Sequence, residues 1–223
     1  MNVSYVIQRF HPLVRPGLHL GAAHSEIAVH SQQSRIDSAC VIHCLLMVLQ
    51  IAGVIDDPSR IATRRRRIEA MLWRKTTEVF LKGMMFSELA TFIADLDCEL
   101  HTKLLERGSH RDTVAFVERE LTRKRLVICS WREVGTLHNH AVLAIGASGI
   151  ERNHRFKPSA LLLLDPAEGP PTTMGTCNAQ LDYASWESGE QRRYARYTTA
   201  NETLSVVLNG AISIEAGEPK KPP

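Results

Sequence analysis

Apolar residues recur at helical spacing in the first part of this chain. From Val41 onward the stretch 37–53 is apolar with few helix breakers until Gly53. Apolar side chains three and four positions apart place one face of a helix against a core. Asp57-Pro58 resembles a helix start, since proline suits the first helical position. Helices are therefore predicted over 37–53, about 57–73, 86–96 and 110–124.

Short runs of branched and apolar residues follow in the second part of the chain. Such runs, bounded by polar residues, glycine or proline, are typical of buried strands. Residues 1–31 are broken by proline and glycine and are expected as an extended lead-in. Residues 149–158 are expected as a hairpin-like loop, and Asn209-Gly210 as a turn. Strands are predicted over 99–105, 126–132, 139–146 and 160–165, with further sheet over 192–199 and 203–214.

Helices followed by antiparallel strands indicate an α+β fold. The chain has 223 residues, of which 44% are hydrophobic, enough for one good core. We expect a single domain over 1–215 with its core at 32–169. Residues 216–223 are rich in proline and lysine and are predicted to be a disordered tail.

Cys40 is the first candidate for chemistry because it falls in the first turn of the helix predicted over 37–53. Asp37 or Ser38 is the expected N-cap, whose side-chain oxygen would accept a bond from a free N–H group. The helix dipole and the unpaired N–H groups there favour an anionic sulfur. A thiolate is a strong nucleophile, so this position predicts a reactive cysteine.

His140 and Asp165 stand at the ends of two predicted strands. His140 opens the strand 139–146, and Asp165 closes the strand 160–165 just before Pro166. A carboxylate beside an imidazole accepts one ring N–H and leaves the other ring nitrogen free. The order Cys40, His140, Asp165 is therefore interpreted as nucleophile, base and orienting group.

The order of these residues resembles the C39-type papain-like cysteine peptidases, a bacterial family. The matching positions are Gln33, Cys40, His140 and the pair Asp165-Pro166, and the resemblance covers roughly residues 32–169. It implies a papain-like fold, in which an N-terminal helical part carries the cysteine and packs on an antiparallel sheet with the histidine and aspartate. It also implies that Gln33 and the Cys40 backbone N–H stabilise the oxyanion.

The predicted activity is a thiol hydrolase that cleaves a peptide, isopeptide or other amide bond with no cofactor. The expected partner is a peptide or protein substrate. The same fold also hosts deamidases and acyltransferases. A binding module without turnover is the other alternative: Gln33 lies seven positions before Cys40 where the family has six, and Val41 stands where the family tends to have glycine.

Several other patterns compete with this interpretation. His138 could replace His140, which is preferred because the buried run begins there. Cys40, His43 and Cys44 share a helical face, but zinc needs four ligands and no second pair with ligand spacing is evident beyond His138 and His140. The sequence therefore predicts no metal. The run Arg64–Arg67 is interpreted as a solvated helix face. Trp131, Tyr183 and Trp186 are expected in packing rather than in a cleft.

Net charge and cysteine content limit which partners and which cellular compartment the sequence favours. The net charge of +3 is too small to favour nucleic acid or a membrane surface. Five widely spaced cysteines suit a reducing compartment better than a disulfide framework. No apolar run reaches the roughly 20 residues that cross a bilayer. Arg9, His11, Arg15 and His19 interrupt any Sec signal pattern. A cytoplasmic location, or export by a specialised secretion system, is expected.

Overall fold

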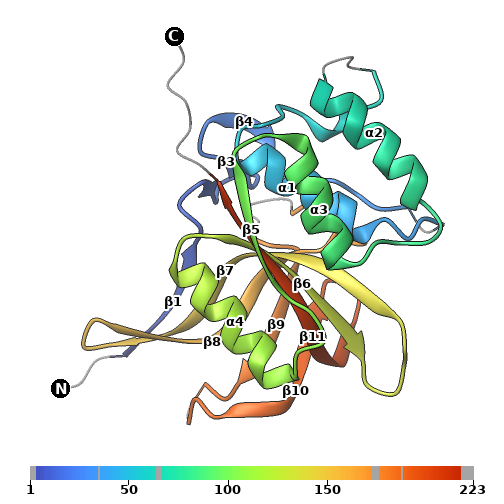
Figure 1. The fold of residues 1–223 in the computed structure, drawn as a ribbon. Coiled ribbons are helices and arrows are strands. Elements are labelled where there is room, and N and C mark those ends of the chain that lie inside the picture. Colours follow the sequence, from blue (N-terminus) through green and yellow to red (C-terminus); the bar gives the residue numbers. More distant parts are fainter. Residues whose placement is uncertain (1–3, 35, 64–66, 172–175, 187, 217–223) are drawn as a thin grey trace.

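The computed structural model describes residues 4–34, 36–63, 67–171, 176–186 and 188–216. Helices α1, α2 and α3 gather on one side of a large sheet, and α4 lies across other strands of it (Figure 1). The helices are α1 (Cys40–Ile51), α2 (Arg67–Val79), α3 (Phe86–Leu96) and α4 (His110–Thr122), with a short 3-10 helix η1 (Pro58–Arg60). The first strands are β1 (Ser4–Phe10), β2 (Val14–Arg15), β3 (Gly21–Ala22), β4 (Ser25–Ala28) and β5 (Leu100–Leu105). The later strands are β6 (Leu126–Glu133), β7 (Asn139–Arg152), β8 (Arg155–Leu164), β9 (Ala179–Ala184), β10 (Gln191–Thr199) and β11 (Thr203–Ala216).

Six of these strands close into an antiparallel barrel. The order is β7-β6-β11-β10-β9-β8, and β8 also pairs with β7, which completes the ring. β1 adds to the outer part of β7, and β5 adds to β11. Strands β2, β3 and β4 form a separate small sheet. The expected papain-like α+β fold is therefore wrong: the dominant unit of the described chain is a closed six-stranded antiparallel barrel, and α1, α3 and α4 pack on strands of its sheet.

Register shifts allow the long strands to bend around the barrel. β7 and β8 shift register between Ala144 and Gly146 and again between Ser148 and Gly149. Such bulges bend a strand and increase its twist. A Cβ atom on Gly146 would lie 2.4 Å from the Arg9 carbonyl oxygen, so only glycine allows β1 to approach there. The closure thus depends on a local irregularity that hydrophobic alternation alone does not predict.

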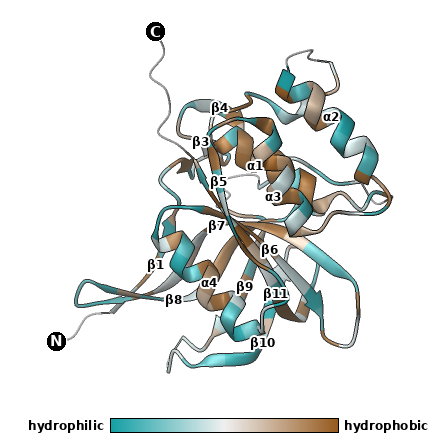
Figure 2. Ribbon diagram, in the orientation of Figure 1, coloured by the Kyte–Doolittle hydropathy of each residue, from teal (hydrophilic) through white to brown (hydrophobic). Residues whose placement is uncertain are grey.

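Two hydrophobic cores lie on the two faces of this sheet. α1 is buried along nearly its whole length and packs on side chains such as Leu143 and Leu164. The second core takes alternate residues from all six barrel strands, among them Val142, Leu161 and Tyr197, so it fills the barrel interior together with α4. Figure 2 shows the matching concentration of hydrophobic residues on α1 and the central strand segments. Because β6, β7 and β8 are covered on both faces, their sequences read as continuous apolar runs.

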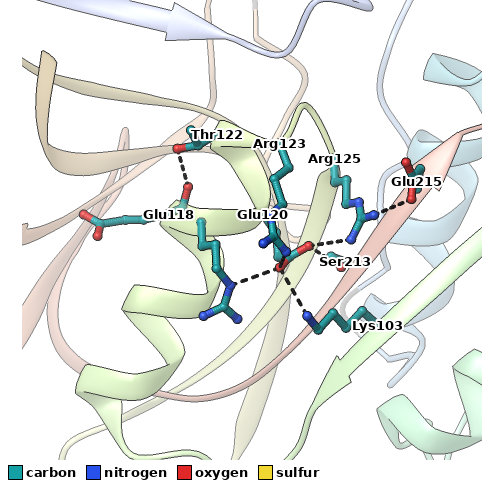
Figure 3. A network of polar contacts seen from close by, with 9 residues as sticks. Lys103, Glu118, Glu120, Thr122, Arg123, Arg125, Ser213 and Glu215 are labelled. Atoms are coloured by element: carbon teal, nitrogen blue, oxygen red, sulfur yellow. Dashed lines mark hydrogen bonds and ion pairs between the residues drawn. The ribbon is translucent and has the colours of Figure 1, made fainter. Parts of the chain in front are cut away.

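A buried carboxylate joins α4 to the neighbouring strands. Glu120, near the end of α4, has a fully buried side chain. It accepts bonds from Arg125, 2.8 Å away, and from Arg119 and Arg123, each 3.2 Å away. Figure 3 shows Arg125 reaching between Glu120 and Glu215 of β11. Burial would raise the pKa of Glu120, but the hydrogen bonds from Arg125 and Arg119 lower it below its usual value.

Several predicted elements agree with the structure, and others differ. α3, α4, β5 and β6 match their predicted ranges within one or two residues. The loop expected at 149–158 is instead two strand ends joined by a tight turn, in which Asn153 and His154 have positive φ. The turn expected at Asn209-Gly210 is a bulge inside the continuous strand β11. The helix expected over 57–73 is two separate pieces, η1 and α2, and β9 was not predicted.

Two sequence predictions fall on other parts of the chain. Arg64, Arg65 and Arg66 of the arginine run lie outside the described residues, as does nearly all of the predicted tail, 217–223. Within the described ranges, no helix has both the length and the apolar character needed to cross a membrane.

Candidate active site

An open cleft with a volume of about 750 Å³ lies between the start of α1 and the barrel. Cys40, His140 and Gln33 all line it, although 100 residues or more separate His140 from the other two along the chain. Three further segments contribute to its wall: the loop before α3, the start of β7 and the bulge of β11. The residues of these segments are Lys82, Gly83, Met84, Met85, His138, Asn139, Asn209 and Gly210.

Cys40 is the first residue of α1. The preceding Ala39 makes no side-chain cap, so the expected capping by Asp37 or Ser38 is wrong. Asp37 instead accepts bonds from the backbone N–H groups of Ser34 (2.7 Å) and Ala39 (3.0 Å), which fixes the turn that leads into the helix. The first turn therefore keeps backbone N–H groups without a side-chain cap beside the sulfur, where they favour negative charge.

The loop after α2 packs against this turn. The Ser38 N–H donates to the Phe80 carbonyl oxygen at 2.6 Å, and Gly83 in the same loop has a φ of +69°. A Cβ on Gly83 would lie 3.3 Å from the Ser38 carbonyl oxygen. Glycine therefore permits both the left-handed conformation and the close approach. This contact holds one wall of the cleft beside Cys40.

His140 is the second residue of β7, and Asp165 directly follows β8. Because β7 and β8 are antiparallel neighbours with Leu143 opposite Leu164, the two side chains lie close together. The His140 Nε2 lies 2.7 Å from the Asp165 Oδ1. The bond leaves Nδ1 as the other ring nitrogen, and the Cys40 thiol lies near enough to interact with the ring. The structure thus brings Cys40, His140 and Asp165 together.

Four further contacts hold Asp165. Its Oδ1 also accepts the Ala167 N–H at 2.7 Å, and its Oδ2 accepts the hydroxyl of Tyr197. Asn178 clamps its backbone, with Oδ1 accepting the Asp165 N–H (2.7 Å) and Nδ2 donating to the Asp165 carbonyl oxygen (2.8 Å). Asp165 is buried, so the bonds from Ala167 and Tyr197 replace water that its carboxylate loses.

His140 and Asp165 shift each other's pKa in opposite directions. Burial would lower the pKa of His140, but hydrogen bonds and charge interactions with Asp165 and Cys40 raise it to about 10. Burial would raise the pKa of Asp165, but the bond to His140, its charge and the bonds from Tyr197 and Ala167 lower it. At neutral pH the pair is therefore an imidazolium facing a carboxylate.

Gln33 lines the same cleft as Cys40, and one of its side-chain N–H groups already makes a hydrogen bond within the chain. Its Nε2 donates to the Asp37 carbonyl oxygen at 2.6 Å, and its backbone N–H donates to the Pro166 carbonyl oxygen at 2.7 Å. A primary amide has two N–H donors, and the bond to Asp37 uses one of them. Its Oε1 is buried without a hydrogen-bond partner in the described chain. The bond to Pro166 ties the segment before α1 to the loop that carries Asp165.

The competing sequence interpretations can be compared with this geometry. His138 lies just before β7 and is exposed, whereas His140 makes the bond to Asp165. His43 accepts or donates a bond with the Ser31 hydroxyl at 2.8 Å, and Cys44 is buried and donates to the Ala141 carbonyl oxygen. Among the described residues, no three His, Cys, Asp or Glu side chains are arranged to hold a metal ion. The other four cysteines are free, and burial raises the pKa of each of them.

Sequence reasoning missed two residues that bond to Asp165, and it placed Trp131 in packing without its contact with the His140 ring. Tyr197 and Asn178 bond to Asp165, and Trp131 meets the His140 ring edge-on with 5.3 Å between ring centroids. Tyr197 carried one signal: Arg196 separates it from Ala195, an alternation that is typical of inward-facing strand residues. Asn178 directly precedes β9 and carried none.

Known proteins give no further assignment. The sequence matches no protein-family model, and a search of curated proteins finds no match to it.

Proposed function

We propose that this chain is a thiol hydrolase that cleaves a peptide bond or another amide bond of a peptide or protein substrate. The observation that carries the proposal is the position of His140, hydrogen-bonded to Asp165 at 2.7 Å and interacting with Cys40 at an open cleft. A nucleophile, a base and an orienting group within bonding reach are the usual signature of covalent catalysis. The order of motifs that resembles C39-type peptidases favours the same activity, although the fold which that resemblance implied is not the one observed.

Acylation would begin with the Cys40 sulfur as a thiolate beside the His140 imidazolium. The sulfur attacks the amide carbonyl carbon, and the C–S bond forms as the carbonyl π electrons move to oxygen. When this tetrahedral intermediate collapses, His140 gives its Nδ1 proton to the departing nitrogen and the C–N bond breaks. An amine leaves, an acyl thioester remains on Cys40, and His140 is left neutral.

Deacylation would use the neutral His140 as a base. It removes a proton from a water molecule in the cleft while the water oxygen attacks the thioester carbonyl carbon. Collapse of the second intermediate releases a carboxylic acid and regenerates the thiolate and the imidazolium. Asp165 keeps the ring in one orientation and stabilises its charged form in both steps. An amine in place of water would give transfer instead of hydrolysis.

The negative charge on the substrate oxygen needs donors in both steps. The backbone N–H of Cys40 at the start of α1 and the remaining N–H of Gln33 are our assignment for these donors. Removing one such donor typically raises the barrier by about 3 kcal/mol.

A binding module without turnover is the second candidate, and one contact favours it. The Gln33 Nε2 is bonded inward to the Asp37 carbonyl oxygen at 2.6 Å, which leaves a single donor for the cleft. If that donor does not reach the substrate oxygen, the same cleft would bind a peptide without cleaving it.

The cysteines bear on where the protein works. Five free cysteines support a reducing compartment and hence the cytoplasm, with export by a specialised secretion system as the alternative.

The test of the proposed function is turnover of peptides. Wild type, Cys40→Ser and Cys129→Ser are incubated with a quenched-fluorescent peptide library, and the products are sequenced by mass spectrometry. Cys129 is a matched control because it is buried and does not line the cleft. We expect cleavage by wild type and Cys129→Ser, and none by Cys40→Ser. Cleavage that persists in Cys40→Ser would contradict the mechanism; absence of cleavage by a wild type that retains a reactive Cys40 would favour the binding module.

A further inference from the structure

Four side chains from four elements form a closed ring of contacts behind the cleft. His140 of β7 bonds to Asp165 after β8, and Asp165 accepts the hydroxyl of Tyr197 on β10. The Tyr197 ring lies against Trp131 of β6 with 4.5 Å between ring centroids. Trp131 in turn meets the His140 ring at 5.3 Å, with 70° between the ring planes. Two members of the ring, Trp131 and Tyr197, belong to the barrel interior.

We propose that Tyr197 is a positioning residue for the reaction: from inside the barrel it fixes the Asp165 carboxylate, and through it the His140 ring, toward Cys40. The inference rests on the proposed function, since it concerns the same three residues. It assigns part of the site to the interior of the barrel, which the substrate does not reach.

The environment of the Asp165 carboxylate supports this role. Its Oδ1 is shared by His140 and Ala167, whereas Tyr197 is the donor to Oδ2 in the part of the chain that the structure describes. Asp165 is only 3% exposed, so water has little access to Oδ2 if the hydroxyl is removed. A carboxylate held at both oxygens cannot rotate, and its Oδ1 keeps a fixed direction toward the His140 ring.

The direction of the titration shifts agrees with the same role. The Tyr197 bond is one of the contacts that lower the pKa of Asp165. Burial, the Asp165 charge and the bond to Asp165 together raise the pKa of Tyr197, so its hydroxyl stays protonated and remains a donor. The proton in this bond therefore belongs to Tyr197, and the negative charge stays on Asp165.

Trp131 closes the ring from the other side. It lies opposite His140 in the β6–β7 register and is 7% exposed. Its ring fills the space between Tyr197 and His140, so neither ring can turn freely. An edge-to-face contact of this kind contributes modestly to stability but restricts ring orientation.

Any test by pH must allow for the other groups near this pair. The groups that interact with Asp165, His140 or Tyr197 are His30, Cys40, Cys44, Glu168 and Glu202. Burial lowers the pKa of His30, which favours its neutral form. Burial raises the pKa of Cys44 well above its usual value, so this thiol stays protonated.

The experiment is the pH profile of Cys40 alkylation by iodoacetamide, read by mass spectrometry in the full chain. The variant is Tyr197→Phe, and the matched control is Tyr183→Phe. Tyr183 is also a buried barrel tyrosine that donates to a carboxylate, that of Glu118 at 2.5 Å, but it does not contact Asp165 or His140. Both variants lose one buried hydroxyl, so a purely structural effect is common to them.

We expect the acid limb of the Tyr197→Phe profile to move to higher pH by about half a unit or more. Without the hydroxyl, Asp165 binds a proton at higher pH, and His140 loses its charge partner there. The Tyr183→Phe profile should match wild type. A Tyr197→Phe profile equal to wild type, or an equal shift in both variants, would overturn the inference while leaving the proposed function intact. If Cys40 of the wild type is labelled no faster than the other accessible thiols, the proposed function itself is overturned, and the inference with it.

A second measurement is made on the wild-type protein, so it does not depend on whether Tyr197→Phe folds. The Tyr197 ring ¹³Cζ resonance in wild type is assigned by elimination against Tyr5→Phe, Tyr183→Phe and Tyr194→Phe, since the chain has four tyrosines. We expect this resonance to change over the same pH range as the acid limb of Cys40 labelling. Protonation of Asp165 changes the bond that the Tyr197 hydroxyl makes and also removes the charge that stabilises the His140 imidazolium beside Cys40. Midpoints more than about one pH unit apart would overturn the inference.

Discussion

The Nε2 atom of His140 lies 2.7 Å from the Oδ1 atom of Asp165, across two antiparallel strands of a closed barrel. The strand pairing fixes this relationship, because β7 begins and β8 ends at the same rim. The rim faces the start of α1, which carries Cys40. One loop–helix junction and one barrel rim are therefore enough to bring together three residues that are distant in the sequence.

Removal of the Asp165 charge should lower the pKa of His140. The value of about 10 depends on the bond to Asp165 and on its charge, while burial acts in the opposite direction. In Asp165→Asn we expect the pKa to fall by about two units or more, measured from the His140 ring resonances by NMR. Asp182→Asn is the control, since Asp182 is equally buried but pairs with Arg196. An unchanged His140 pKa in Asp165→Asn would show that another group holds the proton.

Gln33 should affect turnover but not thiol reactivity. Amide cleavage passes through an oxyanion, whereas alkylation by iodoacetamide is a displacement at carbon without one. For Gln33→Ala we expect kcat/KM on a cleaved peptide to fall about 100-fold, and the labelling rate of Cys40 at pH 7 to change less than about threefold. A parallel fall of both rates would mean that Gln33 supports the structure of the first turn rather than the oxyanion.

The shifted titration of His140 links stability to pH. The folded pKa of about 10 lies above the unfolded value of 6.5. The His140 contribution to stability is therefore fully present below pH 6.5 and is lost as the pH rises to about 10. Between these values the wild type should lose stability relative to His140→Gln, by at most about 1.4 kcal/mol per pH unit. Urea unfolding at pH 6, 8 and 10 measures this difference; a difference that does not change with pH would contradict the raised pKa.

The Glu120 cluster should support stability without affecting Cys40. Its carboxylate is fully buried, while Lys103, Arg119 and Arg123 are about half exposed, at 51%, 47% and 52%. Loss of one partner of a buried ion pair costs roughly 3–5 kcal/mol, and partial exposure reduces this to about 2 kcal/mol for Glu120→Gln.

Thermal or urea unfolding of Glu120→Gln checks this value, with Glu78→Gln as the control. Glu78 pairs with Lys75 on the surface and should cost less than about 0.5 kcal/mol. Cys40 labelling should not change in either variant, since neither residue lines the cleft. Slower labelling in Glu120→Gln would show that the cluster also shapes the site.

Local signals in the sequence were enough to predict the elements that carry the candidate site. The apolar stretch after Cys40 predicted α1, and the runs that begin at His140 and end at Asp165 predicted the relevant ends of β7 and β8. The N-cap prediction was wrong because Asp37 binds the turn before the helix instead of the helix itself. Propensity identifies a residue able to cap, but the chain path decides which N–H groups it meets.

The closed barrel could not be predicted from local sequence patterns, because it depends on pairing between strands that are distant in the chain. β9 is short and was not predicted, yet it joins β8 to β10 and completes the ring. Asn209-Gly210 has the residues of a turn, but pairing with β5 and β6 holds β11 as one strand with a bulge. Tyr197 was missed for the same reason: its contact with Asp165 exists only because the barrel closes.

The central claim is that His140 activates Cys40, and the most direct measurement is the labelling rate of Cys40 by iodoacetamide at pH 7 in wild type and in His140→Ala. Half-buried Cys98 is the internal reference, because burial raises its pKa. The account predicts labelling of Cys40 at least about tenfold faster than Cys98 in wild type, and a fall of about tenfold or more in His140→Ala. Equal rates at the two thiols, or a Cys40 rate that does not depend on His140, would contradict it.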